Sequence, residues 1–299
     1  MEDQKLLAAI QSENADVRFA AWRQAGESTA AVVPELGRLM GASTAPVSKA
    51  AREALTTMAH AVGKDADAPG RAALVTALLG LTTKSNSLPV RVHAFRLLSG
   101  IAGADKAAQV AAALRLPEVQ EEAIYCLERI PGTDADRELL ASYKDVKDDF
   151  KPRVLYALGH RRVQEAAAVC AEAMRSANKQ IAMAAVRAYG RIGKPAAAAA
   201  VYPDSGALSE WQRVEEMDSQ LRFADHQARD GNHTEAMRIY AVALGRAEEH
   251  WQCAGIIGLA KIGTPEAAVA IHPKLKSQNR VVRITAEKAW ISMAPPERV

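Results

Sequence analysis

A pattern that recurs about every 30 residues is the feature of this sequence that most constrains its fold. Each copy has a β-branched residue followed four positions later by alanine: Val17/Ala21, Val47/Ala51, Val90/Ala94, Val119/Ala123, Ile181/Ala185 and Val282/Ala286. The leading residues, here called position 0, are separated by 30, 43, 29, 62 and 101 residues, and 62 is close to two units. Residues four apart share one face of a helix, so each pair marks a buried helical stripe. Repeated stripes of this kind predict stacked helices.

Helix-start and helix-stop signals surround these stripes. The starts are short polar residues that cap free N–H groups, or prolines that fit the first turn. They are Asn14, Thr44 with Pro46, Ser87 with Pro89, Pro117, Asn178 and Asn279. The stops are the glycines expected at helix C-termini, Gly26, Gly63, Gly100, Gly132 and Gly193. A further apolar segment lies between one stop and the next start, as in 30–40, 72–81, 104–114 and 163–174. The repeat unit is therefore predicted to be two antiparallel helices.

The composition favours the same class of fold. Hydrophobic residues make up 49% of the 299 residues, but aromatics only 5%, and 62 residues are alanine. A β-sandwich or barrel needs more β-branched and aromatic residues, whereas alanine has the highest helix propensity and lets helices approach closely. We therefore predict an all-α fold, a right-handed α-solenoid of about eight or nine stacked helix pairs that forms one domain over residues 1–299.

Several copies resemble a known repeat family. The segments Asp16-Val17-Arg18-x-x-Ala21, Val90-Arg91-x-x-Ala94 and Val282-Arg283-x-x-Ala286 resemble HEAT repeats of the short bacterial, lyase-like kind. Residues 189–195 and 259–266 resemble the junction between units in that family. The resemblance covers about 1–200 and 248–294. It implies a HEAT-like superhelix in which the arginine at position +1 (Arg18, Arg91, Arg283) reaches a carboxylate in the adjoining unit.

Residues of about 205–247 follow a different pattern. Residues 203–206 break the helical run, and a long polar helix is predicted over 209–229. The spacing of Ala228, Gly231, Asn232, Ala236 and Tyr240 resembles a tetratricopeptide hairpin. Such a hairpin would stack on its neighbours without a separate core, so we expect a helical insertion within the same domain.

No catalytic or metal-binding motif stands out. The sequence has no GxSxG, GxxxxGK[ST] or HExxH motif and no GxGxxG after a strand. Some helical-repeat hydroxylases hold iron through adjacent His-Glu pairs, but no histidine here is followed by glutamate. Cys126, Cys170 and Cys253 are isolated, which disfavours a disulfide framework or a thiolate metal site. We therefore predict no enzymatic activity, no cofactor and no metal. Without a secretory signal or a membrane-length apolar segment, a cytoplasmic protein is expected.

Alignment of the second helices at position 0 predicts a binding stripe. Positions 0, +4, +7 and +8 should be buried, which makes Trp290 a core residue at +8, and positions +5 and +6 should lie nearer an open, concave face. The candidate binding residues at +5 and +6 are Trp22, Arg23, Arg52, Phe95, Arg96, Tyr125, Arg187 and Lys288. In stacked repeats, the same position in successive units lines one surface. We therefore predict a stripe of basic residues with aromatic side chains between them.

The main functional hypothesis is a non-enzymatic scaffold that binds a protein or peptide on this stripe. Alternatively, the arginines are solvated helix formers that pair with acids of the next unit. A third hypothesis is nucleic-acid binding, in the manner of helical-repeat alkylpurine DNA glycosylases, although 38 basic against 35 acidic residues is a weak bias. Lyases that attach linear tetrapyrroles share these short repeats, but only the fold supports that alternative.

Overall fold

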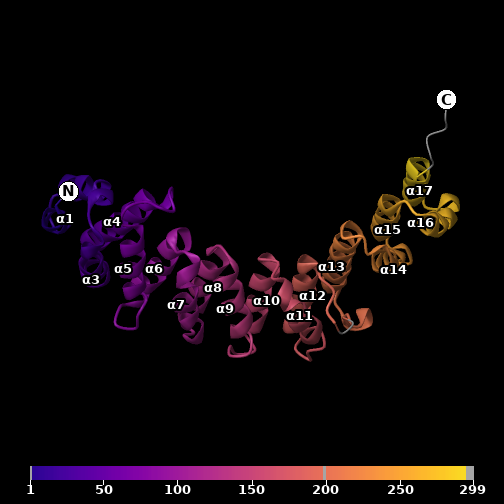
Figure 1. Cartoon of the computed structure of the whole chain (residues 1–299), viewed down its shortest axis with the longest axis horizontal. Helices are drawn as coiled ribbons and strands as arrows, with labels where there is room; N and C mark the ends of the chain where they lie inside the picture. The colour runs from indigo at the N-terminus through magenta and orange to yellow at the C-terminus, as the bar shows by residue number, and fades with distance from the viewer. Residues whose placement is uncertain (1, 198–199, 294–299) are drawn as a thin grey trace. The chain divides into compact units, whose positions relative to one another are not determined.

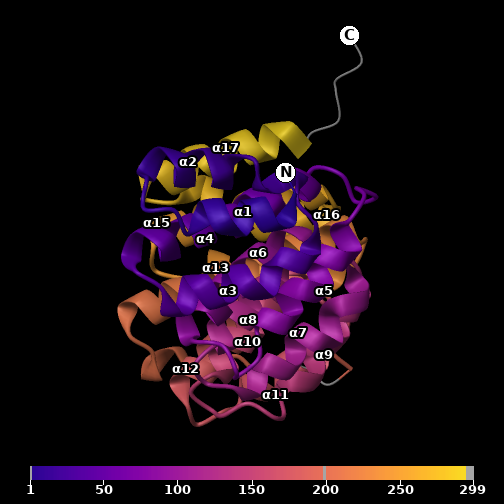
Figure 2. The ribbon, with the colours of Figure 1, turned by 90° about the vertical axis from the view of Figure 1, so that its left-hand side faces the viewer.

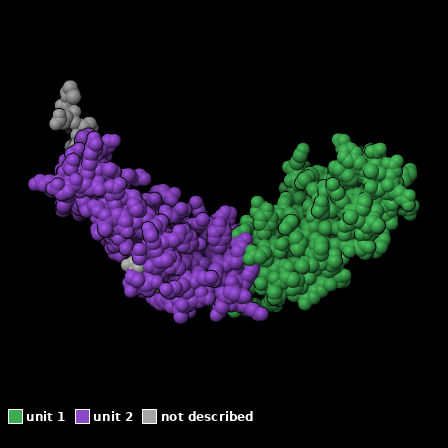
Figure 3. Space-filling view, turned by 180° about the vertical axis from the view of Figure 1, so that it is seen from behind, with its two compact units in different colours: residues 1–146 green, residues 147–299 purple. Residues whose placement is uncertain are grey.

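The described part of the protein is entirely helical. The computed structural model describes residues 2–197 and 200–293, and these residues form 17 α-helices and no β-strand. They make up two compact units, residues 1–146 and 147–299 (Figure 3). The predicted all-α class, built of packed helix pairs, is confirmed. The assignment of residues 1–299 to one domain stays a prediction.

Unit 1, residues 1–146, is a stack of helix pairs. Successive second helices pack side by side (α2, α4, α6, α8), and the first helices α3 and α5 lie beside each other in a second row (Figures 1 and 2). The helices are α1 (Asp3–Ile10), α2 (Ala15–Arg23), α3 (Val33–Ala42), α4 (Ala45–Gly63), α5 (Arg71–Leu81), α6 (Leu88–Ile101), α7 (Ala107–Ala111), α8 (Gln120–Arg129) and α9 (Thr133–Ser142).

Unit 2, residues 147–299, continues the pattern with one change. Its helices are α10 (Lys151–His160), α11 (Ala167–Ala173), α12 (Lys179–Ile192), α13 (Glu210–Arg229), α14 (His233–Leu244), α15 (Glu249–Ile262), α16 (Pro265–Ile271) and α17 (Arg280–Met293). Helix α12 packs between α10 and α13, and α15 packs between α14 and α17. Between α12 and α13 the described residues include one 3₁₀ turn and no α-helix, so α13 lacks a preceding first helix.

Most predicted helix starts are confirmed. The side chain of Asn14 accepts hydrogen bonds from two backbone N–H groups of the first turn, and Asn178 and Asn279 cap α12 and α17 in the same way. Gly193 and Gly263 end α12 and α15 in the left-handed conformation, each with φ +70°. This conformation favours glycine, which explains the recurrent Ile-Gly at these junctions.

The other predicted stops differ in detail. Gly63 is the last residue of α4, Gly100 lies inside α6, and Gly26 lies in a 3₁₀ turn after α2. Gly132 precedes α9 as its N-cap residue, with φ +82°. The apolar segments 104–114 and 163–174 contain 3₁₀ turns beside the short helices α7 and α11.

A recurring hydrogen bond joins each of seven second helices to the segment before it. The side chain at position +1 donates to a backbone carbonyl five to nine residues upstream. The donors are Arg18, Ser48, Arg91, Gln120, Arg213, Gln252 and Arg283. The same contact in α13 and α15 shows that both helices occupy second-helix positions, with Gln212 and Trp251 at position 0.

The predicted ladder of arginines and carboxylates is present at Arg91. Its side chain is buried and also pairs with Glu118 before α8, at 2.9 Å. For Arg18 and Arg283 the prediction is wrong, because both guanidinium groups donate to backbone carbonyls and, within the described residues, pair with no carboxylate. In these two repeats the arginine caps the end of the preceding segment.

Helix α13 has an unusual polar core. Glu216, Gln220 and Gln227 are buried on it, where a helix of this kind normally buries apolar residues. Glu216 accepts hydrogen bonds from Gln220 and from Arg246, and Gln227 donates to the Gly193 carbonyl at 2.6 Å. Burial raises the pKa of Glu216, and Arg246 opposes that shift. The predicted polar helix is thus confirmed, and its polar residues link α12 to α13. Helices α13 and α14 pack together, and their tetratricopeptide-like character stays a prediction.

Two residues predicted to be buried are exposed. Val17 at position 0 of α2 and Trp290 at position +8 of α17 are exposed, the latter by 39%. Both lie on the outermost second helix of their unit among the described residues, where no further described helix pair covers that side. The corresponding positions of an inner repeat, Val90 and Leu98 in α6, are buried.

We predict that Gly190→Ala lowers the thermal unfolding midpoint and that Gly100→Ala raises it. A Cβ at Gly190 in α12 would lie 2.5 Å from the Ser219 carbonyl oxygen of α13, so the helices must separate, at about 1–3 kcal/mol. A Cβ at Gly100 meets nothing within 4 Å, and alanine there should stabilise α6 by about 0.5–1 kcal/mol. Thermal unfolding followed by circular dichroism tests both. Equal midpoints for the two variants would contradict this account of the α12–α13 contact.

Candidate binding surface

The stripe residues of α2 are accessible in part. Arg23 is exposed and its guanidinium lies 5.5 Å from the ring centre of Phe19, which is itself exposed. The half-buried Trp22 meets the same Phe19 ring edge-on, with centroids 5.2 Å apart. Trp22 and Arg23 therefore belong to a small cation–aromatic cluster on α2.

Phe95 does not belong to a binding surface. It is only 1% exposed, and the residues at the same +5 position in α8 and α12, Ile124 and Val186, are fully buried. The prediction for Phe95 was wrong because the neighbours of α6 and α12 cover +5 as well as +4 in these helices, whereas Arg52 at +5 of α4 is exposed. Position +6 is exposed in α6, α8 and α15.

The remaining stripe residues of unit 1 are exposed but dispersed. Arg52 pairs with its neighbour Glu53 at 3.3 Å, so part of its charge is satisfied within α4. Arg96 is exposed on α6. The exposed ring of Tyr125 on α8 lies 4.1 Å from the guanidinium of Arg129. Unit 1 thus holds isolated exposed side chains at these positions.

In unit 2, Arg187 occupies a more organised place. Its guanidinium on α12 pairs with Glu215 of α13 and lies 4.6 Å from the ring centre of Trp211, also on α13. Trp211 is 59% exposed, and Val214 beside it on α13 is exposed too. The ion pair holds the arginine over the indole ring, where cation–π attraction is favourable.

The same helix carries a second arginine one turn later. Arg191 lies 5.1 Å from the ring centre of Tyr156 on α10, and Arg153 lies 5.6 Å from that ring on another side. Tyr156 is 43% exposed and stacks on His160 of its own helix. Since α12 packs between α10 and α13, the four residues Tyr156, Arg191, Arg187 and Trp211 form one continuous surface. We call it the arginine–aromatic surface.

The sequence analysis found Arg187 and missed the other three residues. Tyr156 lies in the 62-residue interval between Val119 and Ile181, which contributed no copy to the alignment at position 0, and Trp211 lies near the start of the predicted insertion. Arg191 is four residues after Arg187 and so shares its helix face. Aligning the junction motif Gly190-Arg191 with Gly159-His160 in α10 would have placed Tyr156 opposite Arg187.

Charge is divided unevenly between the two units. Residues 147–299 contain 22 Lys and Arg against 17 Asp and Glu, a formal net charge of +5. Residues 1–146 contain 16 against 18, a net charge of −2. The weak total of +3 therefore hides a distinctly basic unit 2, which carries the arginine–aromatic surface.

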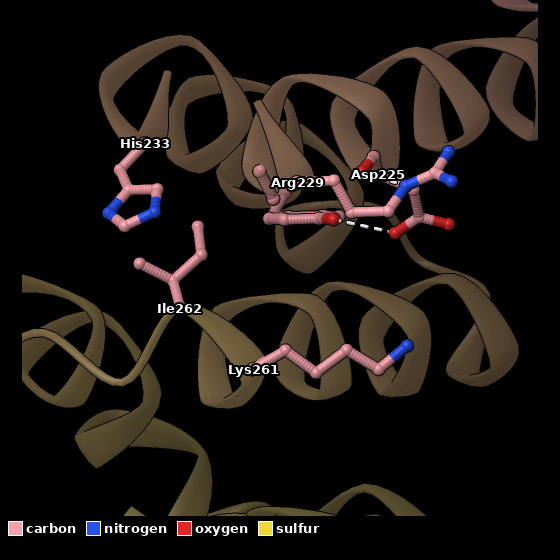
Figure 4. Close-up of a pocket in the computed structure, with 7 residues that line it drawn as sticks. Asp225, Arg229, His233, Lys261 and Ile262 are labelled. Carbon is pink, nitrogen blue, oxygen red and sulfur yellow. Dashed lines mark hydrogen bonds between the residues drawn. The ribbon is translucent and has the colours of Figure 1, made fainter. Parts of the chain in front are cut away.

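A pocket of about 370 Å³ lies between α13, α14 and α15 (Figure 4). The hydroxyl of the buried Tyr240 donates to Asp225 at 2.6 Å. Burial and this hydrogen bond raise the pKa of Tyr240, so the phenol stays a donor at neutral pH. Figure 4 shows the Arg229 guanidinium and the Lys261 ammonium at one end of the pocket, on either side of the Asp225 carboxylate.

A second hollow, of about 560 Å³, lies between α15 and α17. Its lining is largely apolar, with Ile257, Ala260 and Ala289, and it also includes Lys261 and Lys288. Ile257 occupies position +6 of α15 and is 48% exposed. Lys288, a predicted stripe residue, therefore lines a groove rather than an arginine–aromatic cluster.

Residues with metal-binding or nucleophilic groups are scattered. No group of three or more His, Cys, Asp or Glu within the described ranges could hold a metal ion. Burial raises the pKa of Cys126 and of Cys170 to about 12. No helix in the described part of the chain is long and apolar enough to cross a membrane.

Comparison with known proteins gives similarities of fold. No protein-family model matches the sequence, and no curated protein matches it. Among solved structures, an engineered protein is 18% identical over 96% of this chain and 87% of its own, with a TM-score of 0.46. Human deoxyhypusine hydroxylase, in complex with glycerol, is 18% identical over 75% of this chain and 96% of its own, with a TM-score of 0.39. Yeast importin-beta is 12% identical over 97% of this chain, with a TM-score of 0.44, and this chain spans half its length.

We predict that only one of the three thiols reacts rapidly with a disulfide reagent at pH 8. With a pKa of about 12, Cys126 and Cys170 have a thiolate fraction of about 10⁻⁴ at this pH, and both are buried. Cys253 is partly exposed and accessible to the reagent. Counting released thiol by absorbance tests this, with the unfolded protein, in which all three should react, as the control. Rapid reaction of two or three thiols in the folded protein would contradict it.

Proposed function

We propose that the protein is a HEAT-like, non-enzymatic scaffold that binds a protein or peptide on the second helices of unit 2. The observation that carries the proposal is the arginine–aromatic surface. Large exposed rings on rigid helices present contact area at little entropic cost, and Trp, Tyr and Arg are the residues that most often dominate binding energy at interfaces.

The local geometry supports binding in preference to a purely solvated face. A solvated arginine normally extends into water, but Arg187 and Arg191 are held over rings that are themselves exposed. The contacts reduce the freedom of all four side chains before a partner arrives, which lowers the entropy cost of binding. The exposed Val214 extends the apolar part of the surface beside Trp211.

We predict that Trp211→Ala and Tyr156→Ala each weaken peptide binding at least about tenfold. Peptides would first be selected on the full wild-type chain from a random twelve-residue phage library, then measured by fluorescence anisotropy. Both residues are exposed, so the substitutions should change stability by no more than about 0.5 kcal/mol.

Tyr125→Ala in unit 1 is the matched control, since it also removes an exposed tyrosine that contacts an arginine. Its affinity should stay within about twofold of wild type. The proposal fails if no peptide is enriched, or if the three variants lose affinity equally.

Nucleic-acid binding is the second candidate, favoured by the net charge of unit 2 and by rings on which bases could stack. If the partner is a peptide, we expect labelled single-stranded and duplex DNA and RNA to bind no tighter than about 10 μM at 50 mM salt. Anisotropy at about 50 and 200 mM salt tests this. Submicromolar binding with a steep loss at the higher salt would favour nucleic acid, and a base-release assay on alkylated duplex would follow.

A further inference from the structure

Lys261, on the second helix α15 of unit 2, lines two neighbouring hollows. It lines the pocket between α13, α14 and α15 and also the groove between α15 and α17. Lys288 lines the far side of the second hollow. Both lysines therefore line one groove, whose other lining residues are Ile257, Ala260, Thr285, Ala289 and Ser292.

Tight packing fixes the helix that carries Lys261. A Cβ at Gly255 would lie 2.7 Å from the Tyr240 carbonyl oxygen, and one at Gly258 would overlap the Tyr240 ring. Glycines at these positions let α15 lie directly against α14. The Asp225–Tyr240 hydrogen bond holds the same ring from α13. As a result, buried contacts with α14 set the position of α15, the helix that carries Lys261 and one side of the groove.

Neither lysine is ion-paired within the described structure, although Asp225 and Lys261 line the same pocket. Neither Lys261 nor Lys288 forms an ion pair or hydrogen bond with any described residue. Asp225, the acid nearest Lys261 in Figure 4, accepts a hydrogen bond from the Tyr240 hydroxyl and also faces Arg229. Two lysines that share a groove with an exposed isoleucine are complementary to a ligand that combines carboxylates with aliphatic side chains.

We propose that the groove between α15 and α17, with the adjoining pocket at Lys261, binds an acidic peptide segment. Its carboxylates contact Lys261 and Lys288, and an aliphatic side chain packs on Ile257. The inference rests on the proposed function and specifies the chemistry of the partner. A peptide fits the groove between α15 and α17 better than nucleic acid does, because the described residues that line this groove include no aromatic ring on which a base could stack.

The test compares the peptides selected by the wild-type chain with those selected by Lys261→Glu. Lys276→Glu is the control, because it makes the same change of charge at an exposed lysine outside both hollows. We expect wild type and Lys276→Glu to enrich Asp and Glu at least about twofold over the library, and Lys261→Glu to lose this enrichment. Individual peptides should lose at least about tenfold in affinity for Lys261→Glu, or when their Glu residues are replaced by Gln.

The outcomes separate this inference from the proposed function. Peptides that bind and depend on Trp211 but not on Lys261, or that are neutral or basic, overturn the acidic-peptide site and leave the scaffold intact. Equal losses for Lys261→Glu and Lys276→Glu also overturn it, because they indicate attraction by net charge alone. Single-stranded DNA of twelve nucleotides that binds more tightly than the peptides, and depends on Lys261, assigns the groove to nucleic acid. Failure to enrich any peptide removes both proposals.

Discussion

Each second helix must bury apolar surface against two neighbours at once, and the rest of the structure depends on this constraint. A single helix pair cannot enclose its own apolar face, so stability comes from stacking. The helices approach closely where small residues meet, as at Gly159 against Ala188 and Gly190 against Ser219. The +1 hydrogen bond then fixes each second helix to the segment before it. Once positions 0, +4, +5, +7 and +8 are used for packing, as in α6 and α12, position +6 and the residue one turn later are left for a partner.

Helix periodicity and capping residues predicted the class of fold, the repeat unit and most helix starts, because those features depend on local sequence. Burial at +5 could not be predicted in the same way. A residue 100° away from its neighbour on a helix can be exposed or buried, depending on how far the adjacent helix is rotated. That rotation is set by contacts with another repeat, so Phe95 was misplaced although Arg96 next to it was not.

Helix α13 shows a second reason why sequence and surface can diverge. Its polar composition made it resemble an insertion, but its +1 contact and its packing on α12 place it among the second helices. The buried polar groups of Glu216, Gln220 and Gln227 need partners, and the carbonyl at the end of α12 is one of them. Buried polar groups that find defined partners favour one packing arrangement over others. This arrangement is also what places Trp211 beside Arg187.

The two proposed contacts on unit 2 have different physical characters. At the arginine–aromatic surface the cations are already engaged with rings and with Glu215, so a partner gains mainly contact area on Trp211 and Tyr156. At the groove neither lysine is ion-paired with a described residue, so a partner gains charge neutralisation beside the exposed Ile257. Salt should therefore weaken the second contact more than the first, since exposed charge pairs are screened and buried ring contacts are not. For a ligand that contacts both sites, the salt dependence of the affinity would measure the contribution of Lys261 and Lys288.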